Sequence, residues 1–523
     1  MNAALRRTLV ATGAVVCLVV VPGYGQVAAG TAPKALFDGA RPVRSCESLL
    51  ALGVPNTTIE SAAVETGGGG DPAVCRVKAT VTHPPAGDKV GIFVELPVTQ
   101  WNGRFLGTGG GGFSGGSPQR LRQQTVLGYA TAATDTGHEG GSGSFALDSA
   151  GRLNWMLIRD NAYLGIHEMT VLGKYLVEAY YGRQPGHAYF EGCSTGGRQG
   201  LMEVQRYPAD YDGVVAGAPA INWPKLHVEQ LWGELVMREA GNFVPACKFA
   251  AAQAASIAAC DALDGVTDGV IGDPRLCSFD PKALIGTSAG DCGAFTEADA
   301  DVIRKIWQGP RRRDGTFLWY GLPRGADFTG LSKTGGTPIS GEPFGITLDW
   351  WKFFLTQNPQ WDWKTLSLPA YEQFFEQSVE EYGAAIGTDA ADLAAFRDRG
   401  GKAIVWHGQA DPLIYPQGTI DYYERVERQM GGAARTADFI RLFMAPGVGH
   451  CSGGPGPQPA GQLDAVLSWV EEGKSPDTLL TVGRDRSERS SATRPLCPFP
   501  LVARYKGSGG TDDSANFVCS ETY

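Results

Sequence analysis

From residue 89 to residue 217 the chain alternates short hydrophobic runs with glycine-rich turns and amphipathic stretches. Runs at 90–96, 104–106, 129–133 and 188–192 are typical of strands. Residues 161–181 repeat apolar positions at helical spacing and predict a long helix; the predicted face carries Leu164, His167, Val171, Leu172 and Leu176. Strands that alternate with helices predict an α/β fold with a mostly parallel sheet.

The segment 221–390 differs from the rest of the chain. It holds eight of the twelve tryptophans and several cysteines, but few strand-like runs. Strand patterns return at 403–407 and 439–444. We therefore expect one α/β domain, formed by 30–220 and 391–523, that is interrupted by a largely helical inserted domain at 221–390.

The first 29 residues have the pattern of a secretory signal peptide. Arg6 and Arg7 precede an apolar run at 9–21, and small residues at 27–29 offer a cleavage site. This run is shorter than the ~20 residues of a membrane span. We expect a protein that is secreted or periplasmic and does not cross a membrane.

The charge balance narrows the classes of partner. Lys plus Arg is 45 and Asp plus Glu is 55, which gives a net charge of −10 with only 19% charged residues. Such a chain is a poor candidate for binding nucleic acid or an anionic membrane. We expect a small-molecule ligand and a monomer or homodimer.

Of the 11 cysteines, Cys17 lies in the predicted signal peptide and ten remain. An even number in an exported protein predicts disulfides, and the chain has no C-x-x-C pair that would indicate a zinc ribbon or a thioredoxin-like centre.

The sequence Gly-Cys-Ser-Thr-Gly at 192–196 matches G-x-S-x-G between a predicted strand and a helix that is expected to begin near Arg198. In that context the motif forms a nucleophile elbow, so Ser194 is the candidate nucleophile. An ordinary glycine turn is the alternative.

A serine nucleophile needs a histidine base, which in this arrangement follows it in the chain. His450 follows the predicted strand 439–444 in a glycine-rich loop that suits an active site. His407 lies inside the predicted strand 403–407, where a structural role is favoured.

The orienting acid is expected between the serine and the histidine. Asp411 follows the strand 403–407 and is the candidate. Asp421 falls on a predicted helix, and Asp135 precedes the serine.

Two cysteines flank these residues: Cys193 precedes Ser194, and Cys451 follows His450. A disulfide between them would tie the nucleophile turn to the histidine loop.

The oxyanion of an acyl-transfer reaction needs two N–H donors. By the rule for this elbow Thr195 supplies one, and the glycine loop 107–112 is expected to supply the other. Gly110 and Gly111 are the candidates, although the pattern leaves open which glycine of 109–112 donates. A phosphate-binding loop is disfavoured because no lysine follows the glycines.

Together the motif at 192–198, Asp411 and the pair His450-Cys451 resemble the tannase and feruloyl esterase family of α/β-hydrolases. The segments 101–105, 207–213 and 260–280 extend the likeness. The resemblance implies a serine esterase with a lid inserted between nucleophile and acid, and it includes terephthalate monoester hydrolases.

The resemblance also implies a structural calcium ion in the lid. Three carboxylates and two carbonyls within ten residues suit a hard cation, and an acidic surface loop is the alternative. The expected ligands are Asp261, Asp264, Asp268 and the carbonyls of Val266 and Val270.

The same resemblance implies the disulfides Cys260–Cys277, Cys497–Cys519 and Cys46–Cys75, which leaves Cys247 with Cys292. The chain departs from the family at Leu284-Ile285, near which a further cysteine is usual.

We therefore expect a secreted serine esterase that cleaves esters of aromatic acids through an acyl-enzyme. A terephthalate monoester hydrolase is the alternative, less favoured because Thr195 matches the tannase and feruloyl esterase elbow. A peptidase or a non-catalytic calcium-dependent binding protein is a further alternative. Aromatic residues of the inserted segment are expected to form mostly lid core, with some of their surface available to a substrate: Trp350, Trp351, Phe353, Phe354, Trp361 and Trp363.

Overall fold

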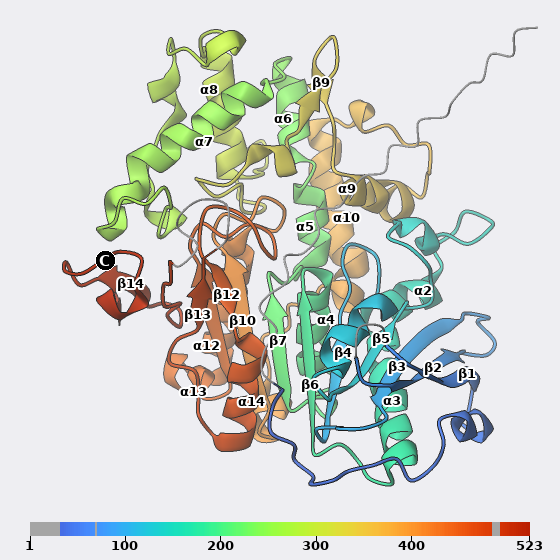
Figure 1. The fold of residues 1–523 in the computed structure, drawn as a ribbon. Helices are drawn as coiled ribbons and strands as arrows, with labels where there is room; N and C mark the ends of the chain where they lie inside the picture. The colour runs from blue at the N-terminus through green and yellow to red at the C-terminus, as the bar shows by residue number, and fades with distance from the viewer. Residues whose placement is uncertain (1–31, 68–70, 484–491, 523) are drawn as a thin grey trace, which may run out of the picture. The chain divides into compact units, whose positions relative to one another are not determined.

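Strands from both halves of the chain build one nine-stranded sheet in the computed structural model, which describes residues 32–67, 71–483 and 492–522 (Figure 1). The order across the sheet is β1-β2-β3-β5-β4-β6-β7-β10-β11. The strands are β1 (Thr57–Glu65), β2 (Val74–Val81), β3 (Val90–Pro97), β4 (Arg104–Thr108), β5 (Ala130–Thr134), β6 (His187–Cys193), β7 (Gly213–Gly217), β10 (Lys402–Gly408) and β11 (Ile440–Ala445).

Neighbouring strands are antiparallel from β1 to β5 and parallel from β5 to β11. The mostly parallel α/β sheet is therefore confirmed. β1 and β2 were not predicted from the sequence. β1 is a largely exposed edge strand, so it lacks the regular alternation of buried and exposed residues that marks a half-buried strand.

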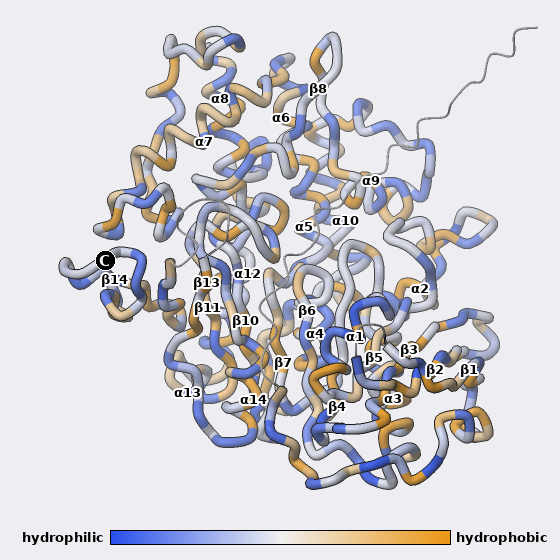
Figure 2. Tube along the Cα trace, in the orientation of Figure 1, coloured by the Kyte–Doolittle hydropathy of each residue, from blue (hydrophilic) through white to orange (hydrophobic). Residues whose placement is uncertain are grey.

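Helices cover both faces of the sheet. Tyr189 and Phe190 are neighbours on β6 but belong to different hydrophobic cores, because successive strand side chains point to opposite faces. Phe190 packs in the core that contains α3 and α12, and Tyr189 in the core that contains α14. Figure 2 shows the hydrophobic stretches along the central strands.

The helices of the α/β part are α1 (Leu121–Thr125), α2 (Trp155–Arg159), α3 (Gly165–Tyr181), α4 (Thr195–Arg206), α11 (Ala394–Asp398), α12 (Pro416–Met430), α13 (Ala433–Ala437) and α14 (Gln462–Glu472). The predicted helix 161–181 is split: a π-helical turn, Asp160–Leu164, precedes α3. Two short hairpins complete this part, β12 (Gln458–Ala460) with β13 (Leu480–Val482), and β14 (Val502–Tyr505) with β15 (Phe517–Ser520).

Between β7 and β10 the chain leaves the main sheet, and the segment 221–390, called the insertion below, lies in this interval. It contains α5 (Trp223–Glu229), α6 (Trp232–Ala240), α7 (Ala246–Cys260), α8 (Glu297–Gln308), α9 (Gly345–Asp349) and α10 (Leu368–Ile386), with the small hairpin β8 (Thr334–Gly335) and β9 (Ser340–Gly341). Figure 1 draws it in green to light orange. The insertion has its own aromatic core, which also takes in Phe113 and Phe145 of the α/β part.

The described residues all belong to one compact unit. The predicted signal peptide, 1–29, lies outside the described residues. In the part of the chain that the structure describes, no helix has the length and hydrophobicity needed to cross a bilayer.

Candidate active site

Ser194 occupies the sharp turn between β6 and α4. Its φ of 65° and ψ of −122° are unusual for a residue with a side chain. The turn closes because its neighbours are glycines: a Cβ at Gly192 would lie 2.5 Å from Gly196, and one at Gly197 would lie 2.3 Å from the Gly217 carbonyl oxygen. This is the strained geometry of a nucleophile elbow.

Three side chains from three strand ends form one hydrogen-bonded chain. Ser194 Oγ lies 2.9 Å from His450 Nε2, and His450 Nδ1 lies 2.8 Å from Asp411 Oδ2. Ser194 follows β6, Asp411 follows β10 and His450 follows β11, so the parallel strands deliver all three at the same edge of the sheet. The structure thus brings together the three residues that the sequence singled out.

Asp411 is fully buried and takes part in four hydrogen bonds. Its Oδ2 faces His450 and His407, and its Oδ1 accepts from the N–H groups of Leu413 and Ile414. Burial alone would raise the pKa of Asp411, but the attraction of His450 and the hydrogen bonds from both imidazoles outweigh it and hold the pKa well below its usual range. Asp411 therefore stays ionised beside His450.

None of the three rival residues forms a hydrogen bond with Ser194. His407 is buried at the end of β10, with Nδ1 2.8 Å from Thr419 Oγ1, which is the structural role expected. Asp421 lies on α12 and binds Arg425, while Asp135 accepts from the N–H groups of its own loop and of β3.

The structure contains the five expected disulfides. Cys193–Cys451 joins the serine turn to the histidine loop, with the two Cα atoms 5.9 Å apart. The other pairs are Cys46–Cys75, Cys247–Cys292, Cys260–Cys277 and Cys497–Cys519.

The expected glycine donors of the oxyanion hole need correction. The Gly110 N–H donates to Gln199 Oε1 at 2.9 Å, and the Gly111 N–H donates to the Ser114 carbonyl at 3.2 Å. Both groups are already used by the protein. The sequence showed a run of bare glycines but not the turn and the glutamine that occupy two of their amides.

Gly112 is the glycine whose amide remains available. It has a φ of 59° in the turn that Gly111 and Ser114 close, and its carbonyl accepts from Thr195 Oγ1 at 2.6 Å. Within the described residues, the N–H groups of Gly112 and Thr195 have no acceptor in the protein. The hydrogen bond between the two residues places these free donors in adjoining parts of the site.

The predicted calcium ligands lie in one loop between α7 and α8, and four of the five residues are buried. Asp261 is 7% exposed and accepts from the N–H groups of Asp268, Gly269 and Val270, so the loop curls around its carboxylate. Asp264 is 5% exposed, and burial raises its pKa to about 6. Carboxylate oxygens are the ligands that a hard cation prefers, and both oxygens of Asp261 already accept backbone N–H groups.

A cation of the protein already contacts this loop. Arg494 Nη2 lies 2.6 Å from Asp268 Oδ2, and Arg494 Nη1 lies 3.9 Å from Asp264 Oδ2. This arginine comes from far along the chain and was not predicted from the sequence. A bound ion would share these two carboxylates with it.

The loop 261–270 also lies against the histidine loop. A Cβ at Gly447, three residues before His450, would lie 2.8 Å from Val270 Cγ1. Val270 therefore lies close to the loop that carries His450.

The aromatic run of the insertion is mostly core, as expected. Trp350, Trp351 and Phe354 are at most 1% exposed, and Phe354 stacks on Phe113 of the glycine loop at 5.6 Å between ring centroids. Phe354 thus packs against the glycine loop through Phe113. Ile346 lies close to Gly112 of the glycine loop, because a Cβ at Gly112 would lie 2.9 Å from Ile346 Cδ1.

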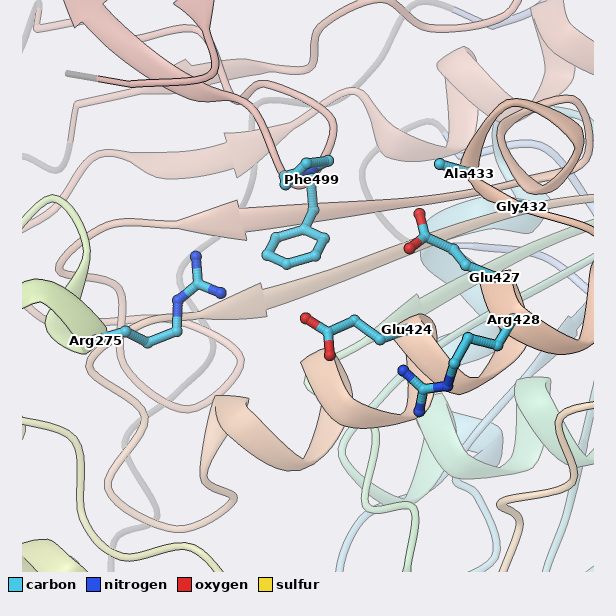
Figure 3. Close-up of a pocket in the computed structure, with 8 residues that line it drawn as sticks. Arg275, Glu424, Glu427, Arg428, Gly432, Ala433 and Phe499 are labelled. Atoms are coloured by element: carbon cyan, nitrogen blue, oxygen red, sulfur yellow. The ribbon is translucent and has the colours of Figure 1, made fainter.

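An open cavity of about 540 Å³ lies away from these residues (Figure 3). Its lining comes from the insertion, from α12, from the start of α13 and from the chain near Phe499: Arg275, Glu424, Glu427, Arg428, Gly432, Ala433, Phe499 and Pro500. Neither Ser194 nor His450 lines it, and its charges are of both signs, so it is not the active site.

The parallel sheet, the strained serine turn after β6 and the order of Ser194, Asp411 and His450 define an α/β-hydrolase, with side chains arranged as in serine hydrolases. The family model described as "Tannase and feruloyl esterase" matches residues 75–520. The chain belongs to the tannase and feruloyl esterase family and is a carboxylic ester hydrolase.

Individual relatives agree. The chain is 40% identical over 484 residues to a probable feruloyl esterase of Arthroderma benhamiae, covering 90% of this chain and 87% of that protein. It is 34% identical to a mono(2-hydroxyethyl) terephthalate hydrolase of Piscinibacter sakaiensis, covering 82% and 81%. The crystal structure of feruloyl esterase B from Aspergillus oryzae superposes with a TM-score of 0.80 at 28% identity, covering 91% and 99%. These relatives favour the enzyme over a non-catalytic binding protein.

Proposed function

We propose that the protein is a secreted serine esterase that hydrolyses esters of aromatic carboxylic acids. The hydrogen-bonded chain from Ser194 through His450 to Asp411 carries the proposal. The relatives are named as feruloyl esterases and a terephthalate monoester hydrolase, and these names support an ester substrate with an aromatic acyl group. The five disulfides and the signal-like first 29 residues support export.

The reaction begins at Ser194. His450 Nε2 takes the Ser194 proton as the oxygen attacks the ester carbonyl, and the ionised Asp411 stabilises the imidazolium through Nδ1–H. The Thr195 and Gly112 N–H groups receive the oxyanion; one such donor contributes on the order of 10²–10³ in rate. His450 then protonates the leaving alcohol, and the acyl-enzyme forms.

Deacylation repeats the same transfers with water. His450 takes a proton from water, which attacks the acyl carbonyl, and returns it to Ser194 Oγ as the acid leaves. The free carboxylic acid and the alcohol are the products.

The lid calcium ion remains part of the proposal. Asp261, Asp264 and Asp268 would hold it with the carbonyls of Val266 and Val270. Bound there, the ion would supply charge that orders the loop and, through Val270, the loop of His450.

A substrate panel tests the proposal. Methyl ferulate, methyl gallate, mono(2-hydroxyethyl) terephthalate and an aliphatic ester of similar size are compared by kcat/KM on one preparation. We expect an aryl ester of ferulic or gallic type to be cleaved best. A preference for the aliphatic ester would refute the acyl specificity, and absence of serine labelling by a fluorophosphonate would refute the mechanism.

The terephthalate monoester is the second candidate substrate, favoured by the 34% identity to the hydrolase of that ester. It differs from ferulate in carrying a second carboxyl group on its ring. The same panel separates the two.

A further inference from the structure

A second group of reactive side chains lies apart from Ser194, around His83. Asp88 Oδ2 lies 2.6 Å from His83 Nδ1, and Glu168 Oε1 lies 2.5 Å from His83 Nε2. Asp160 Oδ1 faces the same Nδ1 at 3.9 Å. His83 and Asp88 lie on the connection from β2 to β3, Asp160 begins the π-helical turn and Glu168 lies on α3.

Asp160 is the residue that an ordinary hydrogen-bond network does not explain. It is 0% exposed, and neither of its carboxylate oxygens has a hydrogen-bond partner among the described residues. A buried carboxylate without partners is strongly disfavoured. Asp88 and Asp160 both face His83 Nδ1, so a cation bound between them would offset the repulsion of the two buried carboxylates.

The charge of the group is unbalanced without an ion. Three carboxylates face one imidazole, so full ionisation leaves a net charge of −2 even with His83 protonated. A divalent cation would balance the charge of neutral His83, Asp88 and Asp160, and Glu168 would keep the one remaining negative charge of the group. One ligand atom from each of these three residues already lies within 4.8 Å of the other two.

We propose that His83 Nδ1, Asp88 and Asp160 bind a divalent transition-metal ion of the Zn²⁺ class. Imidazole together with carboxylates suits such ions, whose bonds to these atoms measure about 2.0–2.2 Å. Binding displaces the proton that His83 Nδ1 and Asp88 Oδ2 now share, and this proton leaves to solvent.

Glu168 orients the imidazole. It accepts from His83 Nε2–H and so leaves Nδ1 as the metal-binding atom, the carboxylate–histidine–metal pattern of many metalloproteins. The side chains of His83 and Glu168 are 24% and 18% exposed, whereas those of Asp88 and Asp160 are 1% and 0% exposed. The ion therefore enters past His83 and meets the buried carboxylates.

The site is linked to the glycine loop. Asn161, next to Asp160, donates to the Phe113 carbonyl at 3.0 Å and to Thr136 Oγ1 at 3.2 Å. An ion on Asp160 would therefore order the segment that supports Phe113, next to Gly112. The proposed site is structural and independent of the lid loop.

A second cluster provides an internal control. His167 Nδ1 lies 2.6 Å from Asp210 Oδ2, with the buried Glu203 beside them. Here Lys174 Nζ, which binds the Asp210 carbonyl, supplies a positive charge from the protein itself. We infer no ion at this cluster.

Zinc binding to the full-length secreted protein tests the proposal, with calcium at saturation so that the lid loop does not compete. Calorimetric titration and metal analysis after desalting should give one more Zn²⁺ per chain in wild type than in Asp160→Asn or His83→Gln. The control His167→Gln should keep the wild-type stoichiometry. Co²⁺ should give a visible absorption band in wild type that Asp160→Asn lacks.

Glu168→Gln is a second variant that keeps all three ligands, and it should bind Zn²⁺ about 10–100-fold more weakly. If Asp160→Asn does not fold, the zinc affinity of Glu168→Gln still tests the proposed site. Equal Zn²⁺ stoichiometry and affinity in wild type, Asp160→Asn and Glu168→Gln would overturn the site. So would a loss of zinc in His167→Gln alone.

Discussion

His407 and Asp411 lie four residues apart at the end of β10 and share a hydrogen bond of 3.1 Å, with both side chains 0% exposed. The accepting oxygen, Asp411 Oδ2, is the one that faces His450. His407 Nε2 faces two acceptors, Asp411 Oδ2 and the Ile414 carbonyl at 2.9 Å, so a proton is assigned to Nε2, while Nδ1 lies 2.8 Å from the Thr419 hydroxyl. His407 is thus a positioning residue for the acid.

His407→Gln should lower kcat about tenfold or more with a smaller effect on KM. A hydrogen bond to a charged group is worth about 1.5–3 kcal/mol, and Asp411 needs it to stay aligned with His450. Steady-state kinetics and the melting temperature are measured together. Thr419→Val, which removes only the contact to Nδ1, is the control that should lose stability more than kcat. Unchanged kcat in a folded His407→Gln protein would contradict the role.

Ser194→Ala should abolish turnover by several orders of magnitude while the melting temperature stays near that of wild type. His450→Ala should cost about as much, and the double variant little more, because the three residues act as a unit. Single-turnover kinetics of a chromogenic ester measure this. Additive losses in the double variant would show that the two residues do not share one step.

Replacement of both Cys193 and Cys451 by alanine should lower kcat as well as stability. The bridge closes a separation of 258 residues, which the chain-entropy model values at roughly 5 kcal/mol. A shift of about 1 Å in the serine or histidine loop can cost about 100-fold in rate. The matched control removes Cys46–Cys75, a buried pair far from Ser194 in the chain, and should lower stability alone. Equal loss of kcat in both double variants would count against a catalytic effect of the bridge.

Chelation of calcium should lower the melting temperature and reduce kcat. An ion at 100 times its Kd stabilises the native state by about 2.7 kcal/mol. The rate should follow because Val270 packs against Gly447 of the His450 loop. Asp261→Asn should remove the response to chelator, and Asp291→Asn, an exposed acid of the insertion, should retain it. A wild-type melting curve that is insensitive to chelator would rule out the lid ion.

Glu234→Gln should stabilise the protein increasingly as the pH rises. Burial raises the pKa of Glu234 on α6 to about 8, so the native state holds a proton that the unfolded chain releases above about pH 4.5. Stability of the wild type therefore falls by up to about 1.4 kcal/mol per pH unit between these values, and the variant lacks this loss. Denaturation at pH 6 and pH 8 measures the difference. Glu239→Gln, on the exposed side of the same helix, should show none.

The sequence alone determined the chemistry of the site. Ser194, Asp411 and His450 each follow a strand, and parallel strands end at one edge, so local patterns were enough to name them. Cys193 and Cys451 added a long-range link, because each sits next to a residue chosen on other grounds. Each of these patterns is local in the chain. The parallel α/β fold brings the residues together because neighbouring strands end at the same edge of the sheet.

Only the tertiary structure decided which residues that are distant in the sequence become hydrogen-bond or ion-pair partners. Gly110, Gly111 and Gly112 look alike in sequence, yet only the turn to Ser114 and the side chain of Gln199 show that Gly112 keeps its amide free. Arg494 reaches Asp268 across 226 residues, a contact with no local signal. The grouping of His83 with Asp160 arises in the same way, because the β2–β3 connection and the π-helical turn before α3 meet only in the folded chain.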